Sequence, residues 1–162
     1  MLFPPLANLK VRHLIIEGKR RSIKSTAALE SNMSNGLILV IDDELDTLEF
    51  IQVVFSKRGY EVLGTPHTRD GLRLARERLP AIILIDLMLP DINGFEACRQ
   101  LRADERTAQV PLVVLSARSS TADRTEAIAA GADRYLVKPV TIKVLAGTIE
   151  ELLKEKGGAR PD

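Results

Sequence analysis

Short apolar runs alternate with longer segments of helical hydrophobic spacing from Gly36 almost to the end of the chain. Apolar runs bounded by turn formers are typical of strands that are buried on both faces of a sheet. They predict strands at Leu37–Ile41, Tyr60–Gly64, Ala81–Asp86, Pro111–Leu115 and Tyr135–Val137. We therefore expect the core to form around a five-stranded sheet.

The segments between these strands have the spacing of amphipathic helices. The apolar positions are Leu45, Leu48, Ile51, Val54 and Phe55 in the first, and Leu72, Leu74, Ala75 and Leu79 in the second, which lies near Arg69–Arg78 before Pro80. Further helices are predicted near Phe95–Ala103, Ala122–Ala130 and Ile142–Leu153. Strands that alternate with helices through short connections form a parallel sheet with helices on both faces. The fold class predicted is therefore α/β, a doubly wound five-stranded parallel sheet with five helices in one domain.

Composition narrows the class of protein. Of the 162 residues, 45% are apolar and 28% are charged, and the net charge of +1 gives no general case for nucleic-acid or membrane binding. No apolar run approaches the roughly 20 residues of a membrane span, and the N-terminus lacks the pattern of a signal peptide. The single cysteine, Cys98, cannot form an internal disulfide, which favours a reducing compartment. We expect a soluble, cytoplasmic protein.

Residues 1–35 differ from the rest in charge and pattern. Their basic residues are Lys10, Arg12, Lys19, Arg20, Arg21 and Lys24, against the acids Glu17 and Glu30, and no hydrophobic period is long enough to build a core. We interpret them as a disordered basic extension. A weak anionic contact through Lys19, Arg20 and Arg21, or a natural start at Met33, are alternatives that the sequence leaves open. The folded domain is predicted to span 36–156, with a flexible tail at 157–162.

The end of the Ala81–Asp86 strand is the first candidate for chemistry. The strand ends at the carboxylate of Asp86, and the turn formers Pro90, Asp91, Asn93 and Gly94 follow within a few residues. The chain thus places one acidic side chain at the carboxyl end of a central strand. In open α/β sheets, ligands bind at that edge.

Three further strand ends carry polar groups, namely Asp42 with Asp43, Ser116 and Lys138. Since the carboxyl ends of parallel strands share one edge of the sheet, these groups should meet Asp86 there. Three adjacent carboxylates repel one another unless a cation joins them, and Mg²⁺ prefers such hard oxygen ligands. With an ammonium and a hydroxyl group added, the set suits a site that holds a phosphoryl group during transfer.

Each of these residues also has an ordinary structural interpretation. Acids before a helix can cap it, Ser116 can do the same, and Lys138 can be a solvated surface charge. The coincidence of all of them at successive strand ends favours the site. The two histidines, His13 and His67, lie outside this set and there is one cysteine, so there is no case for zinc. No glycine-rich phosphate loop is present.

From Leu37 to Leu153 the chain resembles a known family. The runs LVIDDE, IILIDLMLPDINGFE, VVLSA and GADRYLVKP, with the spacing between them, resemble the receiver domain of two-component response regulators, in particular the single-domain chemotaxis-regulator type. The resemblance implies a flavodoxin-like fold with strand order 2-1-3-4-5.

The resemblance also implies roles for the strand-end residues. Asp86 would be the phosphoacceptor, and it would take the phosphoryl group from a phosphohistidine on a histidine kinase or histidine phosphotransfer protein. Asp43, Asp86 and the backbone carbonyl of Met88 would bind Mg²⁺ directly, and Asp42 would act mainly through water. Lys138 would pair with Asp86 or with the phosphoryl oxygens.

The remaining roles concern switching. Ser116 would move to hydrogen-bond the phosphoryl group, Tyr135 would turn inward as the aromatic switch, and Pro139 would follow a cis peptide bond with Lys138. The responding surface for a downstream protein would lie around Ala122–Ala130, Tyr135 and Ile142–Leu153. Met88 and Arg118 occupy the positions that tune the lifetime of the phosphorylated form in this family, and neither suits the orientation of an attacking water, so we expect slow self-dephosphorylation.

We therefore predict a response regulator receiver that accepts a phosphoryl group and switches a protein-binding surface, and not an enzyme in the ordinary sense. Because only nine residues follow Leu153, we expect a stand-alone regulator, a phosphorelay intermediate or a piece of a longer protein, and homodimer formation is left open. The alternative is a phosphorylation-independent scaffold with the same fold, for which the intact acidic pair, acceptor, hydroxyl and lysine would be unnecessary. A hydrolase of similar topology would need a second acid shortly after Asp86, and the residues Leu87 and Met88 supply none.

Overall fold

The computed structural model describes residues 34–157, which form alternating strands and helices. The strands are β1 (Leu37–Ile41), β2 (Glu61–Thr65), β3 (Ile82–Ile85), β4 (Leu112–Ser116) and β5 (Arg134–Val137). The helices are α3 (Leu45–Ser56), α4 (Thr68–Arg78), α5 (Gly94–Ala103), α6 (Thr121–Ala129) and α7 (Ile142–Gly157). Every strand and helix expected from the hydrophobic pattern is present, with ends that differ by a few residues.

The strands form one parallel sheet in the order β2-β1-β3-β4-β5, which confirms the predicted topology. The register pairs Ile41 of β1 with Ile85 of β3, so the residues that follow them, Asp42 and Asp86, leave the sheet side by side. Between β4 and β5 the register pairs Ser116 with Val137. Parallel pairing therefore brings the polar strand ends to one edge.

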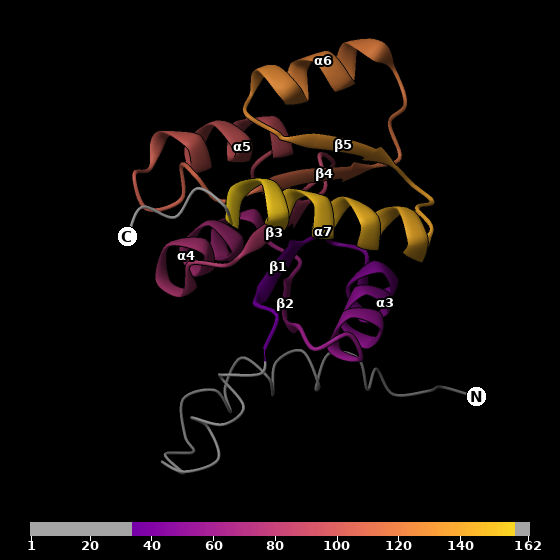
Figure 1. The fold of residues 1–162 in the computed structure, drawn as a ribbon. Coiled ribbons are helices and arrows are strands. Elements are labelled where there is room, and N and C mark those ends of the chain that lie inside the picture. Colours follow the sequence, from indigo (N-terminus) through magenta and orange to yellow (C-terminus); the bar gives the residue numbers. More distant parts are fainter. Residues whose placement is uncertain (1–33, 158–162) are drawn as a thin grey trace, which may run out of the picture.

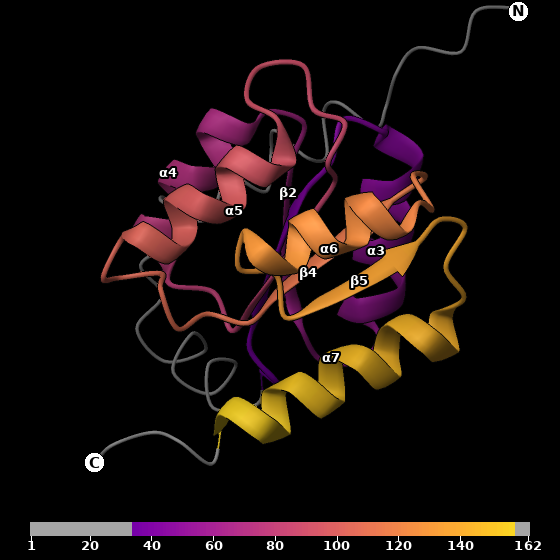
Figure 2. The ribbon, with the colours of Figure 1, turned by 90° about the horizontal axis from the view of Figure 1, so that it is seen from above.

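Helices cover both faces of this sheet, as Figures 1 and 2 show. On one face α4, α5 and α6 pack through residues such as Leu72, Cys98 and Ala127. On the other face α3 and α7 pack through residues such as Ile51 and Ile149. Alternate residues of each strand enter the two hydrophobic clusters, which is why the strands read as continuous apolar runs.

The sequence interpretation was wrong about Leu79, which was expected to belong to the apolar face of the second helix. Leu79 lies just past the end of α4 in the left-handed region, with φ 47°, and its side chain is 50% exposed. The residue before a proline is disfavoured in the right-handed helical region, so Pro80 ends the helix one residue earlier than the apolar spacing suggests. The last helix, in contrast, runs past Leu153 to Gly157.

Two expectations fall outside the described residues. The basic extension is described only from Ser34 onward, and the predicted tail only at Gly157, which is the last residue of α7. Within residues 34–157, no helix has the length and hydropathy needed to cross a bilayer.

Candidate functional site at the carboxyl edge of the sheet

Three carboxylates meet where β1 and β3 end. Asp42, Asp43 and Asp86 each offer an oxygen, and these oxygens lie within 4.8 Å of one another. Asp42 and Asp86 are buried, at 1% and 4% exposure, whereas Asp43 faces solvent. Oxygen ligands at this spacing, with one open side, fit a hard divalent cation that keeps some of its water.

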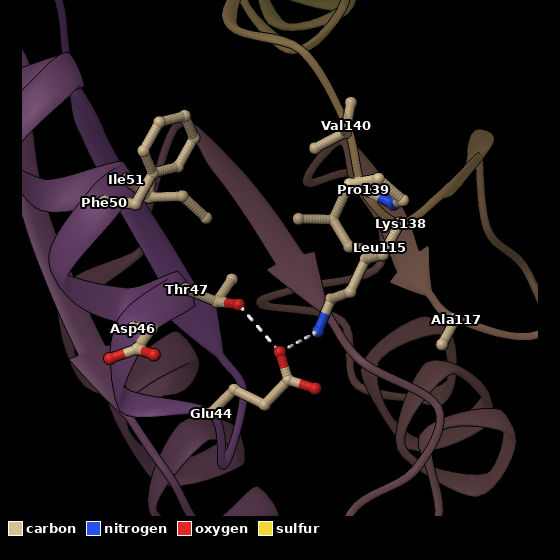
Figure 3. Close-up of a pocket in the computed structure, with 10 residues that line it drawn as sticks. All are labelled: Glu44, Asp46, Thr47, Phe50, Ile51, Leu115, Ala117, Lys138, Pro139 and Val140. Atoms are coloured by element: carbon tan, nitrogen blue, oxygen red, sulfur yellow. Dashed lines mark hydrogen bonds and ion pairs between the residues drawn. The ribbon is translucent and has the colours of Figure 1, made fainter.

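Lys138 joins two of these carboxylates. Its Nζ lies 2.7 Å from Oδ2 of Asp42 and 3.0 Å from Oδ2 of Asp86, and the lysine side chain is 13% exposed. Glu44 is a further partner, with its Oε2 at 3.4 Å from the ammonium, and the same oxygen accepts a hydrogen bond from Thr47 (Figure 3). The peptide bond from Lys138 to Pro139 is cis.

The cluster retains an excess of negative charge after Lys138 is counted. Burial raises the pKa of Asp42, and the hydrogen bonds from Lys138 and from the backbone of Glu44 offset only part of that effect. Burial alone would lower the pKa of Lys138, but its hydrogen bonds with Asp42 and Asp86 outweigh burial and hold the pKa above its usual value. Burial thus favours the neutral form of Asp42, whereas the two carboxylates favour the charged form of Lys138.

The loop of residues 87–93, which follows the predicted phosphoacceptor Asp86 (the acceptor loop), packs closely against the backbone of Asp86 and Leu87. The N–H of Met88 donates to Oδ1 of Asp86 over 3.0 Å, and the N–H of Gly94 donates to the carbonyl of Leu87. A Cβ on Gly94 would come within 2.5 Å of the Asp86 carbonyl oxygen and 2.6 Å of the Leu87 Cα. The glycine that the sequence suggested as a turn former is therefore required by a close approach to the acceptor backbone.

We expect Gly94→Ala to lower the free energy of unfolding by about 2 kcal/mol, because the clash is with backbone atoms that cannot rotate away. The same clash would displace Asp86 and slow the phosphorylation predicted for it. Chemical denaturation and an assay of phosphoryl uptake measure the two effects. Gly147→Ala is the matched control, since nothing lies within 4 Å of a Cβ built at Gly147 in the middle of α7. Equal behaviour of the two variants would contradict this role of Gly94.

Asp91 connects the acceptor loop with helix α4, which the sequence interpretation did not foresee. Its two carboxylate oxygens accept from the backbone N–H groups of Thr68 and Arg69, each over 3.0 Å. Burial opposes ionisation, but the hydrogen bonds that Asp91 accepts, including those from the N–H groups of Arg69 and Thr68, together outweigh it and hold the pKa of Asp91 well below its usual value. His67 at the N-cap makes no side-chain capping bond, so Asp91 caps this helix from a distant part of the sequence.

The predicted switch residues lie together beside the site. Ser116 is fully buried, and its Oγ accepts from the N–H of Arg118 over 3.2 Å. Tyr135 is 5% exposed, and its hydroxyl donates to the carbonyl of Arg118 over 2.7 Å. The structure therefore has Tyr135 in the inward position, whereas its movement with Ser116 stays a prediction. Met88 is 58% exposed.

A pocket of about 480 Å³ opens on one side of Lys138 (Figure 3). Its polar lining comes from Glu44, Asp46 and Thr47 at the start of α3, and its apolar lining includes Phe50 and Val140. A second pocket of about 370 Å³ is lined by Asp43, Met88 and Arg118, among others. The site is thus accessible from two directions.

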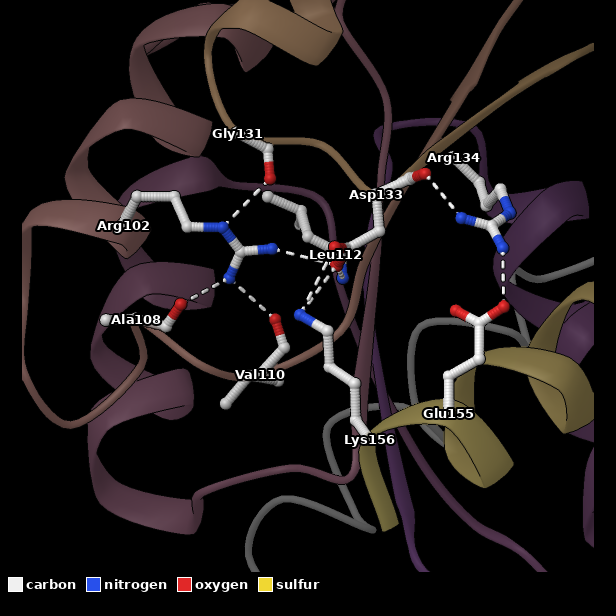
Figure 4. A network of polar contacts seen from close by, with 9 residues as sticks. All are labelled: Arg102, Ala108, Val110, Leu112, Gly131, Asp133, Arg134, Glu155 and Lys156. Carbon is white, nitrogen blue, oxygen red and sulfur yellow. Dashed lines mark hydrogen bonds and ion pairs between the residues drawn. The ribbon is translucent and has the colours of Figure 1, made fainter. Parts of the chain in front are cut away.

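A second polar cluster lies at the amino ends of β4 and β5 (Figure 4), at the opposite edge of the sheet from Asp42 and Asp86. The guanidinium of Arg102 donates to the carbonyls of Ala108, Val110 and Gly131 and to Oδ2 of Asp133. The same Oδ2 accepts from Lys156 of α7 and from the N–H of Leu112. This network connects α5, β4, the start of β5 and α7, so its role is to stabilise the packing of these elements against one another.

Comparison with known proteins agrees with this geometry. Residues 38–150 match the model of the response regulator receiver domain. Protein PilH of Pseudomonas aeruginosa is 34% identical over 72% of this chain and 96% of its own length. Transcriptional regulatory protein AfsQ1 of Streptomyces coelicolor is 38% identical over 72% of this chain and 51% of its own length, and the chain spans about half the length of several such relatives.

Solved structures show the same likeness. The CheY-like receiver domain protein of Methanospirillum hungatei has a TM-score of 0.72 and 26% identity, covering 76% of this chain and 98% of that one. The receiver domain of sensor histidine kinase PA1611 from Pseudomonas aeruginosa has a TM-score of 0.70 and 27% identity, and the match covers 75% of this chain and 99% of that one. That structure holds a magnesium ion in its active-site cleft.

The fold and the acid–lysine edge thus define a phosphoacceptor domain of two-component signalling. The chain belongs to the response regulator receiver domain family.

Proposed function

We propose that this domain accepts a phosphoryl group on Asp86 in a Mg²⁺-dependent transfer from a phosphohistidine of a histidine kinase or histidine phosphotransfer protein. A carboxylate oxygen of Asp86 forms the new P–O bond while the P–N bond of the donor breaks, and its electron pair leaves with the imidazole. The observation that carries this proposal is the contact of one ammonium, Lys138, with both Asp42 and Asp86 beside the third carboxylate of Asp43.

The donor set suits the metal that the reaction needs. Oxygens of Asp43 and Asp86, with the backbone carbonyl of Met88, would hold Mg²⁺, and Asp42 would act through water. When bound, the ion supplies charge that neutralises the phosphoryl oxygens during transfer. Lys138 holds the buried carboxylates in place and offers an ammonium to the same oxygens, while the hydroxyl of Ser116 supplies a further donor.

The output of this reaction would be a change of surface. A phosphoryl group adds nearly two negative charges at one strand end, and Ser116 and Lys138 respond to it. Tyr135 links that edge to the surface formed by α6, β5 and α7, where we place the contact with a downstream protein. We expect this switching to take place in the cytoplasm, with the domain assisting only its own phosphorylation and slow dephosphorylation.

The phosphorylated form is expected to decay slowly. Hydrolysis needs a water that is oriented for attack on phosphorus, and the thioether of Met88 accepts hydrogen bonds only weakly while the guanidinium of Arg118 accepts none. Arg118→Glu or Met88→Asn would introduce a side chain that can orient water, and we expect decay to become about tenfold faster. Following the mass of the phosphorylated chain over time measures this. Decay in seconds by the unaltered chain would contradict the expectation.

Intact mass after incubation with Mg²⁺ and a small-molecule phosphodonor tests the function itself. The unaltered chain should gain one phosphoryl group, and neither Asp86→Asn nor a metal-chelated sample should gain any. Asp70→Asn, which alters an exposed carboxylate on α4, is the matched control and should behave as the unaltered chain. Absence of both phosphorylation and Mg²⁺ binding would favour a phosphorylation-independent scaffold.

A further inference from the structure

Arg118 contacts both predicted switch residues, Ser116 and Tyr135, as well as the acceptor loop and helix α6. Its guanidinium Nη2 lies 2.8 Å from Oδ1 of Asp123 on α6, and its Nη1 lies 3.9 Å from Sδ of Met88 on the acceptor loop. Its backbone N–H donates to Ser116, and its carbonyl accepts from Tyr135. One residue therefore joins the acceptor loop, the end of β4, Tyr135 of β5 and helix α6.

The guanidinium of Arg118 and the ammonium of Lys138 line different pockets beside the carboxylate cluster. Lys138 lines the pocket formed with Glu44 and Thr47, whereas Arg118 lines the other pocket, together with Asp43 and Met88. A phosphoryl group on Asp86 would thus lie beside two pockets that each carry a cation. Lys138 is already engaged with two buried carboxylates, whereas within residues 34–157 the guanidinium of Arg118 contacts only Asp123 and the thioether of Met88.

We propose that Arg118 is a second phosphoryl-binding residue, which exchanges the carboxylate of Asp123 for phosphoryl oxygens when Asp86 is phosphorylated. This inference rests on the function proposed above and adds to it a specific link from the phosphoryl group to α6.

The exchange is a gain for Arg118 and a cost for Asp123. The Arg118 side chain is 48% exposed, so solvent screens its side of the ion pair, whereas the Asp123 side chain is only 12% exposed and would lose its cation. A phosphoryl group offers more charge and matches the planar fork of a guanidinium. Asp123 keeps a partner when Arg118 leaves, because the hydroxyl of Ser120 donates to its Oδ2. The start of α6 would then carry one carboxylate that is no longer neutralised by arginine, which changes the surface offered to a partner.

Substitutions of Asp123 and of Arg118 are expected to change the affinity for a phosphoryl mimic in opposite directions. Asp123→Asn releases Arg118 while its amide oxygen can still accept from Ser120, so affinity for a phosphoryl mimic should rise about threefold. Arg118→Gln removes the phosphoryl contact, so affinity should fall about tenfold. In the double variant, Asp123→Asn should have no further effect, since it acts through Arg118.

Titration of the chain with beryllofluoride in the presence of Mg²⁺, followed by amide NMR, measures these affinities. The Arg118 Nε–H resonance should shift on binding in the unaltered chain. Arg73→Gln and Asp70→Asn, which make the same charge changes on exposed α4, should leave the affinity unchanged. Saturable binding with equal affinities, or with both site variants changed in the same direction, would overturn this inference alone. Absence of binding to the unaltered chain would overturn the proposed function and this inference with it.

Discussion

Replacing Lys138 with alanine is expected to slow phosphorylation of Asp86 by about two orders of magnitude, which is typical of the loss of one preorganised charged donor. The ammonium lies 2.7 Å from Asp42 and 3.0 Å from Asp86. Without it, the buried carboxylates repel one another and the incoming phosphoryl oxygens. The rate of phosphoryl uptake from a small donor, at saturating Mg²⁺, is the measurement.

The same variant should be less stable when Mg²⁺ is absent, by about 3 kcal/mol, since removing one member of a buried ion pair leaves the others uncompensated. Added Mg²⁺ should restore part of that loss by binding the native state. Lys143→Ala removes the same charge from an exposed position on α7 and serves as the control. A Lys138→Ala variant that is phosphorylated as fast as the Lys143→Ala variant would contradict the role assigned to this lysine.

Arg102→Ala should lower the free energy of unfolding by about 3 kcal/mol while leaving the site at the opposite edge intact. The guanidinium makes four hydrogen bonds, to three carbonyls and one carboxylate, and its side chain is only 21% exposed. Loss of a partly buried charged donor of this kind leaves several acceptors unpaired. Chemical denaturation measures the loss.

Two controls separate the geometry of this network from charge alone. Arg102→Lys keeps the charge but not the planar set of guanidinium donors, so it should recover less than half of the lost free energy of unfolding. Arg99→Ala removes an arginine of α5 that is 51% exposed and should change stability by less than about 0.5 kcal/mol. Equal effects of Arg99→Ala and Arg102→Ala would show that the network contributes nothing beyond surface charge.

The hydrophobic pattern was sufficient for the parallel α/β class and for the composition of the carboxyl edge, whereas the strand order came from the resemblance to receiver domains. The three central strands are short apolar runs that end at or beside a polar residue, whereas β2 and β5 also contain polar residues. The pattern therefore locates the ends of the central strands most clearly. Parallel pairing then brings Asp42, Asp86 and Lys138 together, and the structure has them in contact. The inference worked because it needed only the order of elements and the shared direction of the strands, not the conformation of any side chain.

What the sequence did not reveal depends on contacts between distant segments. The caps of α4 come from Asp91, 23 residues from Thr68, and local spacing carries no signal for such a bond. The hydrogen-bond partners of Arg102 lie outside α5. From the sequence alone, an arginine near the end of a helix is ordinarily interpreted as a solvent-exposed side chain. Leu79 could have been predicted correctly, because Pro80 follows it and restricts its backbone.

The most direct test of the central claim is to locate the phosphoryl group. After phosphorylation in Mg²⁺, borohydride reduction converts an aspartyl phosphate to homoserine, and peptide mass spectrometry reports its position. The account predicts homoserine at position 86 alone, and none in a chelated sample. Homoserine at position 42 or 43, or labelling that persists in Asp86→Asn, would contradict the assignment of Asp86 as the acceptor.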